Sequence, residues 1–251
     1  MSKPFRSVLV VSDNEAIVEA FIELITRRPE LKNGRTFDFA CFYSNDAMAK
    51  KYIGGYIMRP LNMKTEYQAI IDSFDLVISA HCKQIFPNEL VTSLKCINLH
   101  PGLNPYNRGW YPQVFSIINK LPLGATLHVI DEKLDHGEII AQEAVEVDAS
   151  DTSLTAYNKV QAAELRLMEV NLEDILNNTY TSVTMKEEGN LNLKKDFEEL
   201  RHIDLNEVIT FGEAIDRLRA LTHHPFKNAY FIDPETGDKV WVEISLEREA
   251  S

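Results

Sequence analysis

The sequence is poor in cysteine and lacks any long apolar run. Its 251 residues include three cysteines, Cys41, Cys82 and Cys96, and no two of them form a C-x-x-C pair. This argues against a disulfide framework or a zinc knuckle, and reduced, buried thiols are expected. No apolar run approaches the roughly 18 residues of a membrane span, and MSKPFRSVLVVSD at the N-terminus lacks the layout of a signal peptide. We predict a cytoplasmic protein without a membrane partner.

Glycine is missing where a phosphate-binding loop would need it. The first expected turn from a strand into a helix reads VVSDNEA, residues 10–16. Loops that cradle a phosphate use glycine so that backbone N–H groups can approach the anion. Asp13 would also repel a phosphate placed beside it. The chain carries no glycine fingerprint for a dinucleotide and no cluster of metal ligands, so neither a nicotinamide cofactor nor a metal is expected.

Positive charge is also scarce, since the formal net charge is −12. Such a chain repels DNA and tRNA over most of its surface, so no nucleic-acid partner is expected. A local basic pocket for a small anion remains compatible with this charge. Hydrophobic residues make up 45% of the chain, an ordinary share for a globular protein of one large domain, with or without a small appendage.

Strand-like and helix-like segments alternate over the first half of the chain. Strand-like stretches cover residues 7–13, 36–44, 75–81 and 95–100, and helical patterns cover 14–31, 67–74 and 107–120, the last interrupted near Pro112. This alternation predicts an α/β fold with a mostly parallel, Rossmann-like sheet and helices on both faces. Ligands of such sheets bind at the carboxyl ends of the strands, and His100 lies at one such end.

The second half predicts a hairpin, a long helix and a small appendage. GATLHVID and GEIIAQEAVEV should pair as a β-hairpin around EKLDHG, and an amphipathic helix capped by Asp151 should follow. Residues 182–209 are polar and loop-like, so we place a domain boundary between 1–181 and 182–251. TFGE has capping-box spacing and should open a short helix, followed by a terminal β-hairpin around PETGD.

Polar side chains end the strand KCINLH. Residues two apart share a face of a strand, so Asn98 and His100 project together, with Cys96 behind them. A third polar residue, Asp135, lies in the expected hairpin loop. Taken singly, Asn98 and His100 could simply hydrogen-bond backbone groups where the strand ends, and Asp135 could form a turn. His128 could be a strand histidine whose ring is hydrogen-bonded within the protein.

Four motifs in order are more specific. They are Asn-x-His-Pro at 98–101, Pro-Tyr-Asn-Arg-Gly at 105–109, Gly-x-Thr-x-His at 124–128 and Asp-x-Gly at 135–137. Together they resemble the 10-formyltetrahydrofolate-dependent formyltransferases, a resemblance that extends over roughly residues 5–180. NPYNRGWYPQ and LPLGATLH are most similar to the branch that formylates nucleotide sugars. The resemblance implies the formyltransferase fold and formyl transfer from 10-formyltetrahydrofolate to the amino group of a dTDP-linked sugar, foremost dTDP-4-amino-4,6-dideoxyglucose. It assigns the catalytic roles to Asn98, His100 and Asp135.

The chemistry of formyl transfer suits this trio. An amine that attacks the formyl carbon creates a tetrahedral oxyanion and a positively charged nitrogen. The Asn98 amide can donate to the oxyanion, and losing one such donor typically costs ~3 kcal/mol of barrier. An imidazole, with a reference pKa near ~6.5, can move a proton near neutral pH, which is the role open to His100. Asp135 can orient that imidazole or take the amine proton itself, and the sequence leaves the base unassigned.

The resemblance also implies binding residues. For folate it points to the backbone of SAHCKQIF and to the loop that precedes Asp135, namely Ser79, Ala80, His81, Lys83, Ile85 and Asp131. Candidate contacts for the nucleotide sugar are Asn14, Tyr106, Asn107, Arg108, Trp110, Tyr111, Tyr157, Lys227, Asn228 and Tyr230. Cations at such positions are common on surfaces, and aromatic residues are common in cores.

Several assignments stay open at this point. A dTDP-3-amino-3,6-dideoxy sugar needs only a shifted pocket, and a formyltetrahydrofolate hydrolase would use the same trio with water as the acceptor. A methionyl-tRNA enzyme is disfavoured, because 15 acidic and 9 basic residues follow position 181. A protein that senses the sugar without turnover would leave the trio without a purpose. We further expect a homodimer formed through the C-terminal hairpin and a product used for lipopolysaccharide O-antigen.

Overall fold

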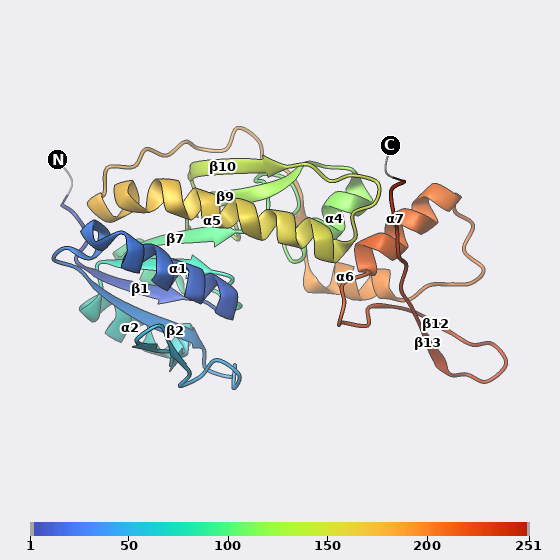
Figure 1. Cartoon of the computed structure of the whole chain (residues 1–251), viewed down its shortest axis with the longest axis horizontal. Helices are drawn as coiled ribbons and strands as arrows, with labels where there is room; N and C mark the ends of the chain where they lie inside the picture. The colour runs from blue at the N-terminus through green and yellow to red at the C-terminus, as the bar shows by residue number, and fades with distance from the viewer. Residues whose placement is uncertain (1–2, 250–251) are drawn as a thin grey trace. The chain divides into compact units, whose positions relative to one another are not determined.

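The computed structural model describes residues 3–249 and shows strands and helices in the expected alternating order (Figure 1). In chain order the elements are β1 (Ser7–Val11), α1 (Glu15–Arg27), η1 (Pro29–Lys32), β2 (Thr36–Phe42), β3 (Tyr52–Ile53), β4 (Tyr56–Ile57), β5 (Arg59–Leu61), α2 (Met63–Ser73), β6 (Leu76–Ala80), α3 (Asn88–Ser93), β7 (Lys95–His100), β8 (Arg108–Gly109), α4 (Pro112–Asn119), β9 (Leu123–Val129), β10 (Ile139–Val145), α5 (Ser153–Asn177), β11 (Leu191–Asn192), α6 (Lys194–Arg201), α7 (Phe211–Leu221), β12 (Ala229–Ile232) and β13 (Lys239–Val242).

Seven strands form the main sheet, in the order β10-β9-β7-β6-β1-β2-β5. β1 pairs in parallel with β2 and β6, β2 pairs in parallel with β5, and β6 pairs in parallel with β7. β9 runs antiparallel to β7, and β10 is the outermost strand beyond it. The predicted α/β fold with a mostly parallel sheet is confirmed.

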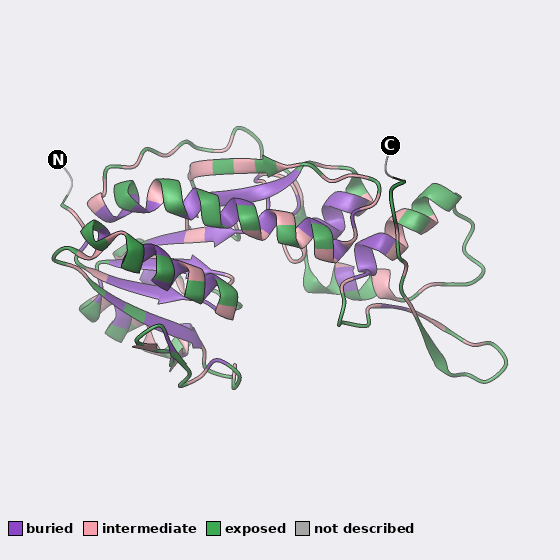
Figure 2. Ribbon diagram, in the orientation of Figure 1, coloured by how far each residue is buried: buried purple, intermediate pink, exposed green. Residues whose placement is uncertain are grey.

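Helices cover both faces of the parallel strands. On one face, α2 and α3 pack over a core that includes Leu9, Val77 and Cys96 from three strands. On the other face, α1 and the part of α5 from Glu164 onward lie over β7, with Leu99 beneath them (Figure 1). β1 and β6 are buried along nearly their whole length (Figure 2). Burial on both faces explains why these strands read as continuous apolar runs.

Helix α1 begins where the sequence provides a cap. Asn14 has an extended backbone, and its side chain accepts a hydrogen bond from the N–H of Ile17 at 3.3 Å. A cap of this kind satisfies one N–H group that the first turn leaves without an intrahelical partner, and it typically contributes ~1 kcal/mol. Phe21 and Leu24 are buried, as their spacing predicts. Asn14, a candidate contact for the sugar, thus has a structural role at the start of α1.

The chain divides into two compact units that interleave along the sequence. The first contains the residues up to His100 together with 126–143 and 164–186. The second contains 101–125, 144–163 and the chain from Glu187 onward. β9, β10 and α5 contribute residues to both units. The predicted domain boundary after residue 181 stays a prediction.

Two local predictions in the second unit are wrong. The helix expected to be interrupted near Pro112 begins there instead, because proline is well suited to the first helical position, where its missing N–H is not needed. Residues 182–209 are not wholly loop, since β11 and α6 lie within them. Phe197 is the buried residue of α6, and six of the eight residues KKDFEELR are charged, so the segment has the composition of a loop.

Helix and hairpin starts in the second unit follow local side-chain chemistry. Thr210 and Glu213 form the predicted capping box at the start of α7, and β12 and β13 form the predicted antiparallel hairpin. At the start of α5, Thr152 rather than Asp151 accepts a hydrogen bond from the N–H of Thr155, at 3.4 Å. Asp151 instead accepts from the hydroxyl of Thr155 at 2.9 Å.

The three thiols are free, as predicted. Cys41 and Cys96 are buried, whereas Cys82 is partly exposed, which corrects the expectation that all three are buried. Burial raises the pKa of Cys41 to about 11 and that of Cys96 to about 12. These thiols therefore stay protonated at neutral pH and act as small apolar core residues.

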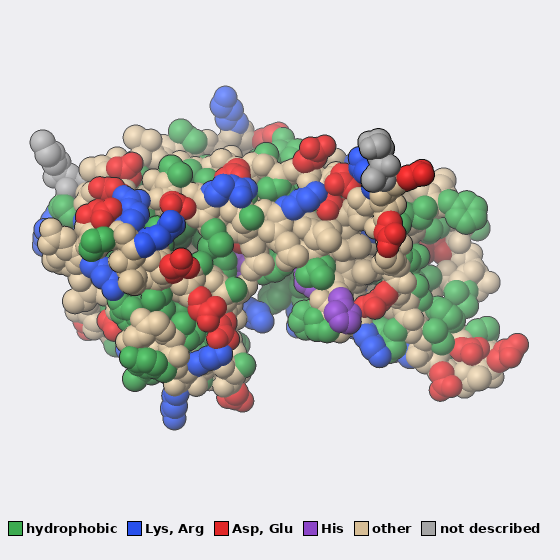
Figure 3. Space-filling model, viewed as in Figure 1, with side chains coloured by type: hydrophobic (Ala, Val, Ile, Leu, Met, Phe, Trp, Pro, Cys, Tyr) green, Lys and Arg blue, Asp and Glu red, His purple; other side chains and the backbone are tan. Residues whose placement is uncertain are grey.

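Acidic and basic side chains are interspersed over the face that Figure 3 presents. Many of them form ion pairs, such as Arg28 with Glu173 at 2.5 Å and Arg166 with Glu143 at 2.5 Å. Pairs of this exposure typically contribute only about 0–1 kcal/mol each. Within residues 3–249, no helix combines the length and the apolar character needed to cross a membrane.

Candidate active site

Strand β7 carries two polar side chains at its carboxyl end. Alternation along the strand separates its side chains into two sets. Cys96 lies in the core under α2 and α3, whereas Leu99 lines a cavity on the side of α1 and α5. Asn98 and His100 are at even spacing from Cys96 and share its face, as the sequence predicts.

Strand β9 extends this face from the antiparallel side. Its register places His128 opposite Asn98 and Thr126 opposite His100. Residues directly opposite each other in a sheet project on the same face. The rings of His100 and His128 meet edge to face, with centroids 6.1 Å apart. Polar residues of two strands thus form one cluster.

Asp135 enters this cluster from the loop between β9 and β10. Its backbone φ of 47° is left-handed, a conformation that non-glycine residues adopt only when their surroundings hold them there. Asp131 holds the loop by accepting a hydrogen bond from the N–H of Lys133 at 2.9 Å. At Gly137 an added Cβ would lie 1.9 Å from the carbonyl oxygen of Val129, so only glycine fits there. This close approach is the physical reason for the glycine of the Asp-x-Gly motif.

The carboxylate of Asp135 joins the polar residues of the two strands. Its Oδ1 accepts a hydrogen bond from Asn98 Nδ2 at 3.3 Å, and its Oδ2 lies 3.6 Å from His100 Nδ1. The side chains of His100 and Asp135 are only 5% and 10% exposed, so water screens their interaction little. The amide, imidazole and carboxylate predicted from two distant segments therefore lie together. Their catalytic roles stay a prediction.

His128 belongs to this cluster, although the sequence analysis did not assign it there. Its Nδ1 lies 2.8 Å from the carbonyl oxygen of Val129, which can only accept, so Nδ1 carries the proton. Its Nε2 lies 3.2 Å from Asn98 Nδ2 and 3.6 Å from Asp135 Oδ1. The two N–H groups of the Asn98 amide thus point at His128 and Asp135. The Gly-x-Thr-x-His spacing was the available signal, because Thr126 and His128 share a strand face.

This cluster has the parts needed for acyl transfer to an amine. An oriented amide N–H can stabilise negative charge that develops on an oxygen, and an imidazole beside a carboxylate can take and return a proton. As for metals, the described part of the chain places no three His, Cys, Asp or Glu side chains in an arrangement that could hold an ion.

The loop after β6 is the segment that the resemblance assigns to folate. Ser79 and Ala80 are buried at the end of the strand, and Ile85 is 84% exposed. Lys83 donates its backbone N–H to Asp13 Oδ2 at 3.0 Å. Asp13, in the turn after β1, therefore stabilises the loop after β6. The sequence analysis did not suggest this role.

His81, in the same loop, also has a left-handed backbone, with φ of 59°. Its ring Nε2 lies 2.9 and 2.8 Å from the two carboxylate oxygens of Glu164, a fully buried residue of α5. The imidazole is therefore directed into the protein. Glu164 is a second residue that the sequence analysis did not single out.

In the second unit, Asn107 has an interior structural role. It is fully buried, and its Oδ1 accepts hydrogen bonds from Asn119 at 2.9 Å and Asn190 at 2.8 Å. Its Nδ2 donates to Ser116 at 3.1 Å. Both ends of the amide are thus engaged within the protein, which leaves this candidate sugar contact poorly placed to bind a ligand through its side chain.

Its neighbours in the Asn-Arg-Gly-Trp-Tyr run differ in exposure. Arg108 is buried and lies 3.4 Å from Glu188, whereas Tyr106 and Trp110 are half-buried. Tyr111 packs against Phe197, with ring centroids 4.1 Å apart. Tyr111 is half-buried as well, so exposure does not separate the three aromatic candidates.

The remaining candidates for the sugar also lie in the second unit. Tyr157 packs near His223, with ring centroids 5.6 Å apart, and Asn228 donates to the carbonyl oxygen of Leu221 at 3.0 Å. Lys227 is exposed. Tyr230 contacts the hairpin's own aromatic residue, Trp241, at a centroid distance of 5.4 Å. Their roles in binding stay predictions.

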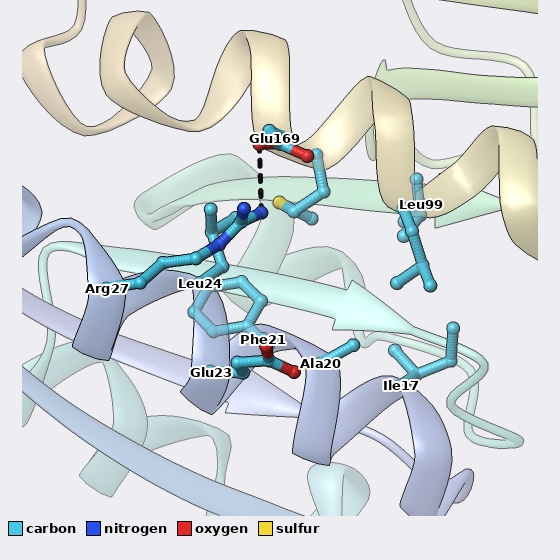
Figure 4. Close-up of a pocket in the computed structure, with 10 residues that line it drawn as sticks. Ile17, Ala20, Phe21, Glu23, Leu24, Arg27, Leu99 and Glu169 are labelled. Carbon is cyan, nitrogen blue, oxygen red and sulfur yellow. Dashed lines mark ion pairs between the residues drawn. The ribbon is translucent and has the colours of Figure 1, made fainter.

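A separate cavity of about 240 Å³ lies on the opposite face of β7 (Figure 4). Its apolar lining includes Ile17 and Phe21 of α1 and Leu99 of β7, and an ion pair of 2.9 Å between Arg27 and Glu169 lies at this cavity. Because Leu99 projects away from Asn98 and His100, this cavity is not part of the polar cluster.

The fold and the polar cluster define a class of one-carbon transferases, and the chain belongs to the formyl transferase family. The model of that family matches residues 45–171, and the model of the N-formyltransferase dimerization C-terminal domain matches residues 196–248.

Its relatives narrow the class further. The chain is 51% identical to a dTDP-4-amino-4,6-dideoxyglucose formyltransferase of Mycobacterium tuberculosis, over 72% of this chain and 76% of the relative. The crystal structure of a 4-N formyltransferase from Francisella tularensis matches with a TM-score of 0.91 and 47% identity, covering 97% of this chain and 98% of the other. A sugar N-formyltransferase from a Shewanella species matches with a TM-score of 0.91 and 40% identity, covering 98% of this chain and 99% of the other.

Proposed function

We propose that this formyltransferase moves the formyl group of 10-formyltetrahydrofolate to the amino group of a dTDP-linked amino-dideoxy sugar, foremost dTDP-4-amino-4,6-dideoxyglucose. The observation that carries the proposal is the convergence of Asn98, His100 and Asp135, at 3.3 and 3.6 Å, in a chain 51% identical to an enzyme named for that sugar. The relatives named for a 4-amino position favour this isomer over the 3-amino sugar.

The polar cluster supplies each part of the transfer. The neutral amine forms a bond to the formyl carbon, negative charge develops on the formyl oxygen, and the bond from that carbon to the folate nitrogen breaks. Asn98 donates an N–H to the charged oxygen. His100 and Asp135 together accept the proton that the amine loses and return one to the leaving nitrogen.

The cluster also explains how Asn98 is prepared for this role. In the structure its N–H groups are directed at His128 and Asp135. Proton uptake by the pair of His100 and Asp135 weakens the carboxylate as an acceptor, so one N–H of Asn98 can turn to the formyl oxygen. The Asp135 carboxylate keeps the amide in this orientation, because an oxygen that can only accept requires the nitrogen end of Asn98 to face it.

The loop after β6 fits a folate in two respects. Ile85 offers an exposed apolar side chain for a flat ring, and the left-handed turn at His81 presents main-chain groups that can read the donor and acceptor edge of a pterin. When bound, the folate supplies the activated formyl carbon. Ser79, Ala80, Lys83 and Asp131 complete the proposed folate contacts.

A kinetic assay tests the proposal. Purified protein is mixed with 10-formyltetrahydrofolate and a panel of 3-amino and 4-amino dTDP sugars, and folate consumption and sugar formylation are both measured. We expect consumption to depend on the 4-amino sugar and to match its formylation one to one. Consumption without any sugar dependence would identify a hydrolase, and preference for a 3-amino sugar would overturn the assignment of the isomer.

We also propose a domain organisation and an oligomeric state for the enzyme. Residues 1–181 form the catalytic domain and 182–251 a C-terminal appendage, with homodimerisation through the terminal hairpin. The match of residues 196–248 to a dimerization domain supports the latter part. The cytoplasm as the site of the reaction and lipopolysaccharide O-antigen as the destination of the product remain expectations from the sequence.

A further inference from the structure

A left-handed residue in the folate loop is held from inside the protein. His81 has φ of 59°, directly after β6. For a residue other than glycine this conformation persists only where its surroundings determine it, and such residues concentrate at binding and active sites. The contacts that hold His81 therefore decide the path of the main chain that follows it.

The first of these contacts is a buried carboxylate on α5. Glu164 has no exposed surface, and both of its oxygens lie within 2.9 Å of His81 Nε2. Burial raises the pKa of Glu164, and the charge and hydrogen bond of His81 act against that shift. A buried carboxylate is costly unless it is paired, so a neutral side chain would be the simpler choice for packing alone.

The second contact comes from Asp13 in the turn after β1. Its backbone N–H donates to the carbonyl oxygen of His81 at 3.3 Å, and its Oδ2 accepts from the N–H of Lys83 at 3.0 Å. Its Oδ1 accepts from the N–H of Phe42 at 2.8 Å and from Asn45 at 3.0 Å. Asp13 thereby links the loop after β6 to the chain at the end of β2.

We propose that Glu164 is a positioning residue for the folate donor, because it fixes the left-handed turn at His81 and thus the main chain that reads the pterin. The inference rests on the proposed function. Glu164 acts through the loop and does not touch the reacting atoms, so its loss should weaken donor binding and leave the chemical step and the amino sugar unaffected.

The test compares Glu164→Leu and Glu164→Gln with wild type. We expect Glu164→Leu to raise KM for 10-formyltetrahydrofolate about tenfold, equivalent to about 1.4 kcal/mol, with kcat and KM for the sugar within about twofold. Glu164→Gln, which keeps a hydrogen-bond acceptor for the ring, should show a smaller rise. The control is Glu169→Gln, an exposed glutamate on the same helix that pairs with Arg27, and it should match wild type.

A double variant separates positioning from general stability. Asparagine adopts the left-handed conformation more readily than most residues, so His81→Asn combined with Glu164→Leu should recover much of the donor affinity lost in Glu164→Leu. An unchanged donor KM in a folded Glu164→Leu protein would overturn the proposal. A fall in kcat with both KM values unchanged would also overturn it, because it would indicate a loss of active protein.

Donor binding is also measured directly, by calorimetry with 5-formyltetrahydrofolate. A weaker Kd in Glu164→Gln than in wild type supports the proposal even if Glu164→Leu does not fold, and an equal Kd contradicts it. Wild-type protein that binds this folate but transfers no formyl group to any sugar would refute the proposed function while leaving the positioning role of Glu164 intact.

Discussion

Asp135 shows how one neighbouring residue can place a functional group. The loop that carries it can pass close to β9 only because Gly137 has no side chain to meet the carbonyl oxygen of Val129, 1.9 Å from where a Cβ would lie. With the loop in this position, the left-handed backbone of Asp135 directs its carboxylate to Asn98 and His100. The motif Asp-x-Gly is thus a geometric requirement as well as a chemical one.

Asp135→Asn should reduce kcat by about 10²- to 10⁴-fold, because the amide can neither accept the amine proton nor stabilise a charged His100. KM for the sugar should change little. Steady-state kinetics measure both, and Glu132→Gln, an exposed residue of the same loop, serves as the control. A wild-type kcat in Asp135→Asn would remove the carboxylate from the mechanism.

Among the elements, β8, α4 and β11 are joined through one buried side chain. Asn107, which directly precedes β8, donates to Ser116 of α4 and accepts from Asn119 of α4 and, at 3.3 Å, from Asn192 of β11. Its backbone N–H also donates to the side chain of Asn190 at 2.8 Å. A buried amide with partners at both ends holds irregular segments that have little apolar surface of their own.

Asn107→Ala should lower the free energy of unfolding by about 3 kcal/mol, because several buried polar groups lose their partner at once. Urea unfolding followed by circular dichroism measures this loss. Asn206→Ala, at an exposed position, should have little effect. An unchanged stability together with a raised KM for the sugar would instead assign Asn107 to substrate binding.

The capping box of α7 should make a pH-dependent contribution to the free energy of unfolding. The backbone N–H and then the hydroxyl of Thr210 donate to Glu213 and lower the pKa of its carboxyl below the ordinary value of 4.5. A lowered pKa means that the ionised form stabilises the fold above pH 4.5, and that this contribution disappears as the pH falls through the lowered pKa.

Glu213→Gln should therefore be less stable than wild type at pH 7, and the difference should shrink as the solution is acidified below pH 4.5. Thermal unfolding at a series of pH values measures it. Glu247→Gln, on the exposed C-terminal segment, provides the matched change of charge. A difference that stays constant with pH would contradict the role of the ionised cap.

For the whole molecule, the open question is assembly. The terminal hairpin exposes apolar side chains, with Ile232 42% and Trp241 37% accessible. Strand β12 also forms an isolated bridge with His202, whereas β13 pairs only with β12 among the described residues. Free strand edges and exposed apolar groups of this kind are covered in stable proteins, often by a second copy.

Trp241→Glu should convert the proposed homodimer into a monomer, which light scattering coupled to size-exclusion chromatography detects as a halved mass. Phe211→Glu places the same charge at another exposed apolar residue of the C-terminal region, 91% accessible at the start of α7. If Phe211→Glu alone breaks the dimer, the interface lies at α7 and not at the hairpin.

The sequence by itself determined the elements and their faces. Continuous apolar runs that alternate with helical segments predicted β1, β2, β6 and β7. The two-residue period of a strand predicted that Asn98 and His100 share a face. These features depend on neighbours close in the chain, so periodicity and turn chemistry suffice to read them. The helix α6 was not predicted, because its many charged residues give the segment the composition of a loop.

Only the tertiary structure decided which distant residues meet. The register of β9 against β7 placed His128 beside Asn98, and the approach of α5 to β6 placed Glu164 under His81. A shift of β9 by one residue would have left its sequence pattern unchanged and turned His128 to the other face. Pairing across 30 or 83 positions depends on the packing of the whole sheet and its helices, which local patterns do not encode.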